Sequence, residues 1–137
     1  MIPMKAKDIM TVARKVEFVY HDITIGEAID KMARNRYTMI PVLERNSMRY
    51  LYSLSSSDIL RKVMADNNPA VTREALLSSI SVQRFIVPCA QSTDINDLTD
   101  LVINQNYVPL VDEKGVFQGI VTRRAIINYL LSSMEGE

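Results

Sequence analysis

The sequence predicts an α+β fold made of two pseudo-symmetric units, each a small mixed sheet with two helices. The chain has 137 residues, which suits one compact domain or two very small ones that share a core. Hydrophobic residues make up 47% and charged residues 23%, as in ordinary globular proteins and unlike disordered chains. Two blocks of sequence also recur after about half the chain, which indicates a repeated structural unit.

The repeat is clearest around two prolines. Pro41 lies in the segment TMIPVL, and Pro109 follows 68 residues later in the segment YVPLV. Ser55 comes shortly after the first segment, and Thr122 follows it 67 residues later at the matching place. Because the spacing holds within one residue over two separate blocks, we interpret the chain as two copies of one unit.

The first unit begins with a strand and a helix. Residues 16–20 alternate in polarity and are rich in β-branched and aromatic types, which favours a strand. Thr24 and Glu27 then have the spacing of a capping box. Apolar residues follow at helical intervals until about Arg36, so this segment is predicted to be an amphipathic helix.

Two further strands and a helix complete the first unit. Residues 39–43 and 50–54 predict strands that a polar hairpin joins, and Ser55 begins the second helix. We place the first unit at residues 5–66 and a linker at residues 67–74, because the linker opens on a polar Asp-Asn-Asn-Pro stretch.

The second unit, at residues 75–134, repeats this order. The predicted elements are a strand at 85–87, a helix through residues 95–102, strands at 107–111 and 116–121, and a helix from 122 to about 131. Neither unit alone can bury both faces of so short a sheet. We therefore expect the two units to pack sheet to sheet with their helices outside.

Charge and hydropathy exclude several classes of function. Sixteen basic and sixteen acidic residues give a formal net charge of +0, whereas a general nucleic-acid binder carries a basic excess. No apolar stretch approaches the roughly 20 residues that span a bilayer, and the start of the chain lacks the apolar region of a signal peptide. We expect a soluble, cytoplasmic protein with neither a nucleic acid nor a membrane as partner.

The residue inventory also argues against catalysis. Four scattered glycines leave no phosphate loop or dinucleotide fingerprint. His21 is the only histidine and lies in a turn without a Ser or Cys partner, and the only cysteine, Cys89, follows an apolar run where an inert core thiol is expected. We expect no enzyme, no metal and no cofactor. A small hydrolase that uses His21 and Asp22 remains an alternative.

The repeated blocks resemble cystathionine-β-synthase (CBS) domains paired in tandem as a Bateman module. The resemblance covers roughly Lys5 to Leu131. It rests on the hydrophobic-Pro-hydrophobic strand, present at Pro41 and Pro109, and on the Ser/Thr-x-x-Asp helix start from Ser55. It implies two CBS units that sense an adenine nucleotide and do not turn it over.

A narrower resemblance is to the small stand-alone CBS proteins of Gram-positive bacteria that bind cyclic di-AMP. It rests on the segment from Gly119 to Arg124 and on a shortened turn before residue 107. Glu17 and Ala125 depart from the pattern, because an acidic group stands near the implied site and an alanine replaces the ribose-binding aspartate. The ligand-binding residues that the resemblance implies are Lys15, Tyr37, Thr38, Met39, Ile40, Pro41, Thr122, Arg123 and Arg124.

The arginine pair has independent physical support. Thr122 is a good helix N-cap, so Arg123 and Arg124 fall in the first turn of a helix, where the macrodipole disfavours cations. The first unit has Ser56 and Ser57 there, so the architecture does not require arginines. Exposed amides and two guanidinium groups together favour a phosphate. The alternative is that both arginines extend into solvent.

A second possible nucleotide cleft uses the other helix start. Asp58 can bind a ribose diol, although Ser55 and Asp58 also make an adequate local cap. Tyr50 and Tyr52 stand where small residues usually give room, so this cleft is expected to be partly filled. Its residues would be Ser55, Asp58, Tyr107, Val108 and Pro109.

These observations favour a regulatory sensor that binds cyclic di-AMP between the two CBS units and controls a partner protein. The alternatives are a sensor of AMP, ADP or ATP, and an interaction module with vestigial nucleotide sites that acts on a stringent-response enzyme. The resemblance suggests an alarmone synthetase as the partner, and it implies a homodimer that associates through helices.

Overall fold

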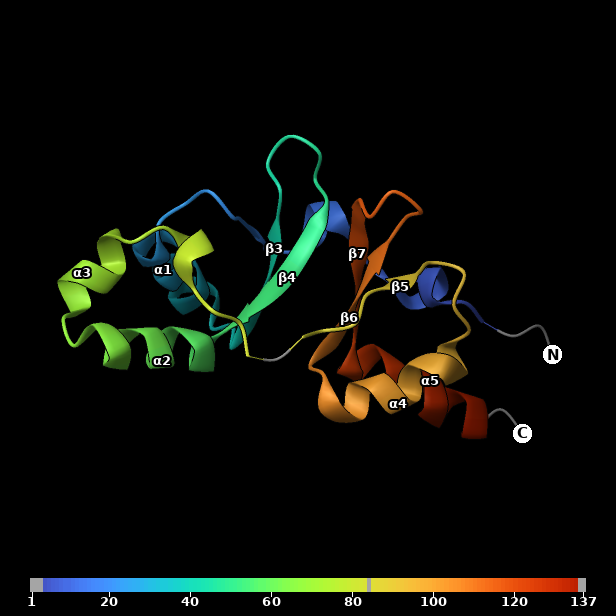
Figure 1. Ribbon diagram of the computed structural model, residues 1–137. Helices are drawn as coiled ribbons and strands as arrows, with labels where there is room; N and C mark the ends of the chain where they lie inside the picture. Colours follow the sequence, from blue (N-terminus) through green and yellow to red (C-terminus); the bar gives the residue numbers. More distant parts are fainter. Residues whose placement is uncertain (1–3, 84, 136–137) are drawn as a thin grey trace. The chain divides into compact units, whose positions relative to one another are not determined.

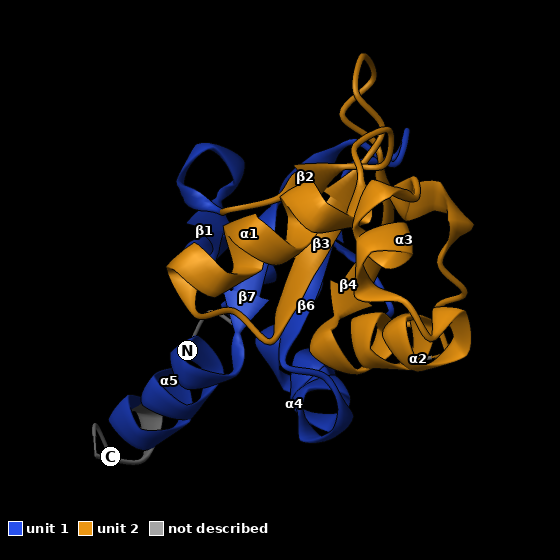
Figure 2. Ribbon diagram, turned by 90° about the vertical axis from the view of Figure 1, so that its left-hand side faces the viewer, with its two compact units in different colours: residues 1–16, 86–137 blue, residues 17–85 orange. Residues whose placement is uncertain are grey.

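The structure is a computed structural model that describes the backbone of residues 4–83 and 85–135, with side chains up to residue 132 (Figure 1). The chain divides into two compact units (Figure 2). Unit 2 is the continuous segment Glu17–Phe85, whereas unit 1 combines Met1–Val16 with Ile86–Glu137. Unit 2 therefore corresponds to the first sequence repeat and unit 1 to the second. The first sixteen residues belong to unit 1, the same compact unit as the second repeat.

Unit 2 has a three-stranded sheet with the order β2-β3-β4, in which β2 is parallel and β4 antiparallel to β3. Its core packs residues of α1 against β3 and β4, and Ile25, Ile40 and Leu54 are fully buried there. In chain order its elements are β2 (Val19–Tyr20), α1 (Ile25–Asn35), β3 (Met39–Leu43), β4 (Tyr50–Ser55), α2 (Ser56–Asp66), α3 (Pro69–Glu74) and the 3-10 turn η3 (Leu77–Ser79).

Unit 1 has a four-stranded sheet with the order β1-β7-β6-β5, so it repeats the arrangement of unit 2 and adds β1 at one edge. Its core places Leu98 of α4 against Val108 and Val121 of the sheet. In chain order its elements are η1 (Ala6–Ile9), β1 (Thr11–Val12), η2 (Ala13–Lys15), β5 (Cys89–Ala90), α4 (Ile95–Asn104), β6 (Tyr107–Val111), β7 (Phe117–Thr122) and α5 (Arg123–Glu135).

The added strand depends on a glycine. β1 pairs antiparallel with β7, with Val12 opposite Gly119. A Cβ atom at Gly119 would lie 2.2 Å from the Thr11 carbonyl oxygen and 2.8 Å from Met10 Cγ, which no real side chain permits. The register in unit 2 places Tyr52 at the matching position of β4, where no further strand pairs within the described sheet.

Most of the predicted elements are present, with three differences. The expected strand at residues 16–20 shrinks to Val19–Tyr20. Residues 85–87 are not a strand, because the pairing with β6 begins only at Cys89, and Phe85 is 69% exposed. The segment at 67–74, expected to be a linker, contains α3, whose Thr72 is fully buried and donates to Asp66 at 2.7 Å.

No helix in the described part of the chain is long and apolar enough to cross a membrane.

Candidate functional site

The two helix starts occupy equivalent places in the two units. In unit 2, Met39 at the start of β3 lies opposite Ser55, and in unit 1, Tyr107 at the start of β6 lies opposite Thr122. Ser55 is the N-cap of α2, and Thr122 precedes the first residue of α5, Arg123. Arg123 and Arg124 of unit 1 therefore correspond to Ser56 and Ser57 of unit 2, as the sequence repeat predicts.

In unit 2, three predicted ligand residues lie beside the start of α2. The Ser56 amide donates to the Thr38 carbonyl at 2.9 Å, which fixes the segment between α1 and β3 against the helix start. Tyr37 is 41% exposed, Thr38 is exposed and Met39 is half-buried. A hollow of about 390 Å³ adjoins this segment, and its lining comprises Ile29, Met32, Ala33, Arg36, Tyr37, Ser56 and Ile59.

The next two predicted residues are buried. Ile40 belongs to the core of unit 2 with no exposed surface, and Pro41 is also buried. Packing alone therefore accounts for Ile40. Tyr107, Val108 and Pro109 of β6, predicted for the second cleft, are likewise buried, and Val108 belongs to the core of unit 1.

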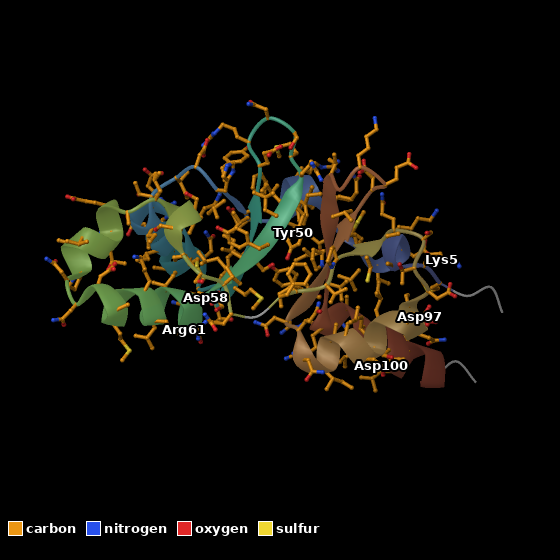
Figure 3. The ribbon with its side chains drawn as sticks, in the orientation of Figure 1. Lys5, Tyr50, Asp58, Arg61, Asp97 and Asp100 are labelled. Carbon is orange, nitrogen blue, oxygen red and sulfur yellow. The ribbon has the colours of Figure 1, made fainter. Side chains whose placement is uncertain are left out.

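The Asp58 carboxylate is already engaged by its own unit (Figure 3). One oxygen accepts from the Ser55 amide at 3.0 Å and from the Ser55 hydroxyl at 2.9 Å. The other accepts from Arg61 and from the Gln83 amide, the latter at 3.4 Å. Asp58 is only 3% exposed. Its carboxylate completes a capping box and fixes the segment before residue 84, so a ribose would have to displace these partners.

Of the two tyrosines of β4, Tyr52 lies near enough to Asp58 to feel its charge, whereas Tyr50 lies at the opposite end of the strand. The Tyr50 hydroxyl lies 2.8 Å from Ser53 Oγ, and burial raises the pKa of Tyr50 to about 12. Burial, and then the negative charge of Asp58, also raise the pKa of Tyr52. The Tyr52 hydroxyl is buried and has no hydrogen-bond partner among the described residues. Both side chains are half-buried in unit 2.

The start of α5 in unit 1 has a different chemistry. The Thr122 hydroxyl accepts from the Ala125 amide at 3.1 Å, so Thr122 is an N-cap, as predicted. Ala125 supplies no carboxylate, whereas its counterpart Asp58 does. Arg124 is exposed, and within the described residues its guanidinium makes no hydrogen bond or ion pair. A cation in the first turn of a helix remains uncompensated there.

Arg123 does have partners. Its Nε donates to the Val102 carbonyl at 2.7 Å and its Nη2 donates to the Gln105 carbonyl at 2.9 Å. Both carbonyls lie at the C-terminal end of α4, where a positive charge is favoured. Gln105 is buried, and its side-chain amide accepts from the Val87 amide at 3.0 Å and donates to the Tyr107 carbonyl at 3.1 Å.

Lys15 lies elsewhere in unit 1. It is exposed and ends η2, directly after β1. Since β1 runs antiparallel to β7 with Val12 opposite Gly119, η2 follows toward the Phe117 end of β7, away from α5. Arg123 lies four residue steps beyond Gly119 along the strand, roughly 13 Å. Glu17, the departure noted in the sequence, pairs with Lys31 at 3.3 Å.

The residues of the hydrolase alternative do not form a catalytic pair. Both Asp22 carboxylate oxygens accept from Arg45, at 2.7 Å each, and this hydrogen bonding holds the pKa of Asp22 below its usual value. His21 Nδ1 is buried without a hydrogen-bond partner among the described residues. Burial, together with Asp97, raises the pKa of Cys89, which makes its thiol less reactive.

Three site residues were missed from the sequence. Arg61 holds Asp58 from the next turn of α2, and its i,i+3 spacing was a readable signal. The Gln83 backbone amide donates to Asp58, and the buried Gln105 side chain accepts from the Val87 amide. Neither has a motif, because a single glutamine carries no spacing signal.

The CBS domain family model matches residues 6–65 and 71–132, so the chain belongs to the CBS domain family. The fold is that of several solved CBS structures. A CBS domain-containing protein of unknown function from Bacillus anthracis is 23% identical, with a TM-score of 0.82 and 94% of each chain covered. CbpB in complex with c-di-AMP is 16% identical, with a TM-score of 0.84, covering 97% of this chain and 88% of that one.

CBSX2 in complex with AMP is 20% identical, with a TM-score of 0.75, covering 95% of this chain and 98% of that one. Two curated relatives are longer proteins. An uncharacterized protein from Methanocaldococcus jannaschii is 21% identical, and the chain spans 48% of its length. The SNF1-related protein kinase regulatory subunit gamma-1 from Arabidopsis thaliana is 25% identical, and the chain spans 32% of its length.

Proposed function

We propose that the protein is a non-catalytic regulatory sensor that binds cyclic di-AMP. The observation that carries the proposal is Arg124, an exposed guanidinium without a partner among the described residues, in the first turn of α5. This position is unfavourable for a cation unless an anion joins it. A phosphate there would accept from the helix amides and from the guanidinium together.

Tyr37, Thr38 and Met39 would supply the contacts to adenine. They combine an exposed aromatic ring, a hydroxyl and a half-buried thioether on one short segment. Lys15 lies toward the opposite end of β7 from the arginines, so it would contact a different group of the ligand. A dinucleotide with two phosphates and two adenines offers such separate groups. The c-di-AMP complex of CbpB, a protein of the same fold, supports this ligand class.

Titration calorimetry with cyclic di-AMP, AMP, ADP and ATP tests the ligand. We expect saturable heat with cyclic di-AMP and at least a tenfold loss of affinity in Arg124→Ala, the range for a hydrogen bond to a charged group. Arg34→Ala, which removes an exposed arginine from α1, is the matched control and should bind normally. Saturation by AMP alone would reject cyclic di-AMP.

The alternative is a mononucleotide sensor that uses Asp58 in the second cleft. The AMP complex of CBSX2 favours it. The engagement of both Asp58 oxygens and the nearby Tyr52 disfavour it. If AMP binds, Asp58→Asn should abolish the heat and Arg124→Ala should leave it unchanged.

We also propose that the protein is a homodimer whose nucleotide state is read by a partner enzyme, for which the sequence resemblance suggests an alarmone synthetase. Apolar side chains exposed on helices support self-association, namely Leu60 and Met64 on α2 and Ile127 and Leu131 on α5. Light scattering measures the oligomeric state. Synthetase activity assayed with the protein, with and without cyclic di-AMP, measures the coupling. An absence of any nucleotide binding alongside altered synthetase activity would instead indicate an interaction module.

A further inference from the structure

We infer that the two adjacent arginines have different roles: Arg123 is a positioning residue that ends α4 and holds the turn before β6, and Arg124 alone contacts the ligand phosphate. The division of roles in ligand binding rests on the proposed function. The structural role of Arg123 does not.

The first argument is the loss of a helix-ending turn in unit 1. α1 ends at Arg36 in the left-handed conformation, and the Met32 carbonyl accepts from the Tyr37 amide at 3.0 Å. The matching stretch in unit 1 is two residues shorter from the start of the helix to the start of the next strand, and α4 ends at Gln105 in an extended conformation. This shorter connection has no left-handed turn to cap its helix.

The second argument is that Arg123 replaces this missing turn. Val102 is the eighth residue of α4, and Met32 is the eighth residue of α1. The Val102 carbonyl therefore corresponds to the Met32 carbonyl, and it accepts from Arg123 Nε at 2.7 Å. Arg123 Nη2 reaches the Gln105 carbonyl at 2.9 Å. One side chain thus bonds the carbonyls of two buried residues at the C-terminal end of the helix, where the last carbonyls need partners from outside it.

The third argument concerns the availability of the guanidinium. Nε and Nη2 form the side of the guanidinium fork that grips a carboxylate or phosphate with two parallel bonds. In Arg123 both already donate to backbone carbonyls. The charge of Arg123 is also compensated by the C-terminal end of α4, whereas that of Arg124 is not. The repulsion between the start of α5 and its two arginines is therefore offset for Arg123 by the end of α4, and it is not offset for Arg124.

Equivalent glutamine variants separate the two roles. The Nε2 atom of a glutamine is the same number of bonds from the backbone as arginine Nε, so Arg123→Gln keeps a donor toward Val102 and removes the charge. Titration with cyclic di-AMP should give an affinity within about threefold of wild type for Arg123→Gln, with an unchanged dependence on salt. Arg124→Gln should lose at least tenfold and become less sensitive to salt. Equal losses of affinity and of salt dependence in the two variants would overturn the proposal.

A second measurement does not require a ligand. Arg123→Ala should lower the melting temperature of the free protein and speed amide hydrogen exchange at residues 105–107, and Arg123→Gln should restore both. Arg124→Ala is the matched control: because it removes an uncompensated cation, it should neither lower the melting temperature nor speed this exchange. If wild type binds no nucleotide, the proposed function fails, and this measurement still decides the role of Arg123. Unchanged exchange and melting in Arg123→Ala would show that Arg123 does not hold the turn.

Discussion

The helix start of unit 2 and that of unit 1 lie at the same place in the same fold, and they differ in charge. At α2, Ser55 and Asp58 complete a capping box, and Arg61 and Gln83 engage the remaining carboxylate oxygen. At α5, Thr122 caps the helix without a carboxylate, and two arginines follow it. The comparison teaches that a helix start satisfied by its own side chains is a structural element, whereas one left with excess positive charge favours an anion.

The largest expected effect is the loss of Asp58. Asp58→Ala removes the acceptor of the Ser55 and Gln83 amides, and we expect the free energy of unfolding to fall by about 3 kcal/mol, because buried donors lose their partner. Urea unfolding measures this loss. Asp100→Ala, which removes an exposed carboxylate from α4 (Figure 3), is the control and should change stability by less than about 0.5 kcal/mol. Equal effects would mean that the cap is not the source of stability.

Gly119→Ala tests the edge strand that distinguishes the two sheets. The new Cβ would meet the Thr11 carbonyl, so β1 must move away from β7. We expect a loss of about 2–3 kcal/mol, the usual cost of overpacking. Hydrogen exchange at residues 11–12 should rise. Gln118→Ala is the neighbouring control, and retained protection at residues 11–12 in Gly119→Ala would contradict the close approach.

Alkaline pH should destabilise unit 2 more than unit 1. Tyr50 in unit 2 has a pKa of about 12, and the corresponding residue in unit 1 is Phe117. The folded state holds the Tyr50 proton more tightly than the unfolded state, whose tyrosine has a pKa near 10. Stability is therefore fully present below about pH 10 and falls as pH rises toward 12, by up to about 1.4 kcal/mol per pH unit. Tyr50→Phe should remove this part of the slope in urea unfolding.

The smallest effect should come from restoring the missing carboxylate. Ala125→Asp gives α5 the capping box that α2 has, next to the uncompensated Arg124. We expect a gain of about 0.5–1 kcal/mol in unfolding free energy. The same variant should weaken the binding of cyclic di-AMP, since the new carboxylate competes with the ligand phosphate for Arg124 and the helix amides. Tighter binding would contradict the assignment of a phosphate to this helix start.

Much of the fold could be predicted from the sequence because β3 and β6 carry a strong local pattern. Strand pairing over residues 39–43 and 107–111 is as predicted, and so is the cap at Thr122. The short edge strands were predicted too long or misplaced, because an apolar run at 85–87 looks like a strand whether or not a partner strand is present. The pairing of β1 with β7 could not be predicted, since its signal is a glycine far along the chain.

The candidate site was less predictable than the fold. Side-chain types made the arginines and Tyr37 candidates, but they did not reveal which of these groups already have hydrogen-bond partners within the protein. That Arg123 bonds two carbonyls depends on where α4 ends, which composition does not reveal. The same holds for Asp58, whose motif is intact while its oxygens are engaged by Arg61 and Gln83.

The discontinuity of unit 1 has a consequence for biosynthesis. A ribosome delivers the segment up to Val16 before unit 2, and the rest of unit 1 only after residue 85. Unit 2 is contiguous and can begin to fold as soon as it emerges, as early segments generally do. The leading segment must then wait until β7 is made before it finds its place. A slowed ribosome downstream of residue 85 should therefore disturb unit 1 more than unit 2.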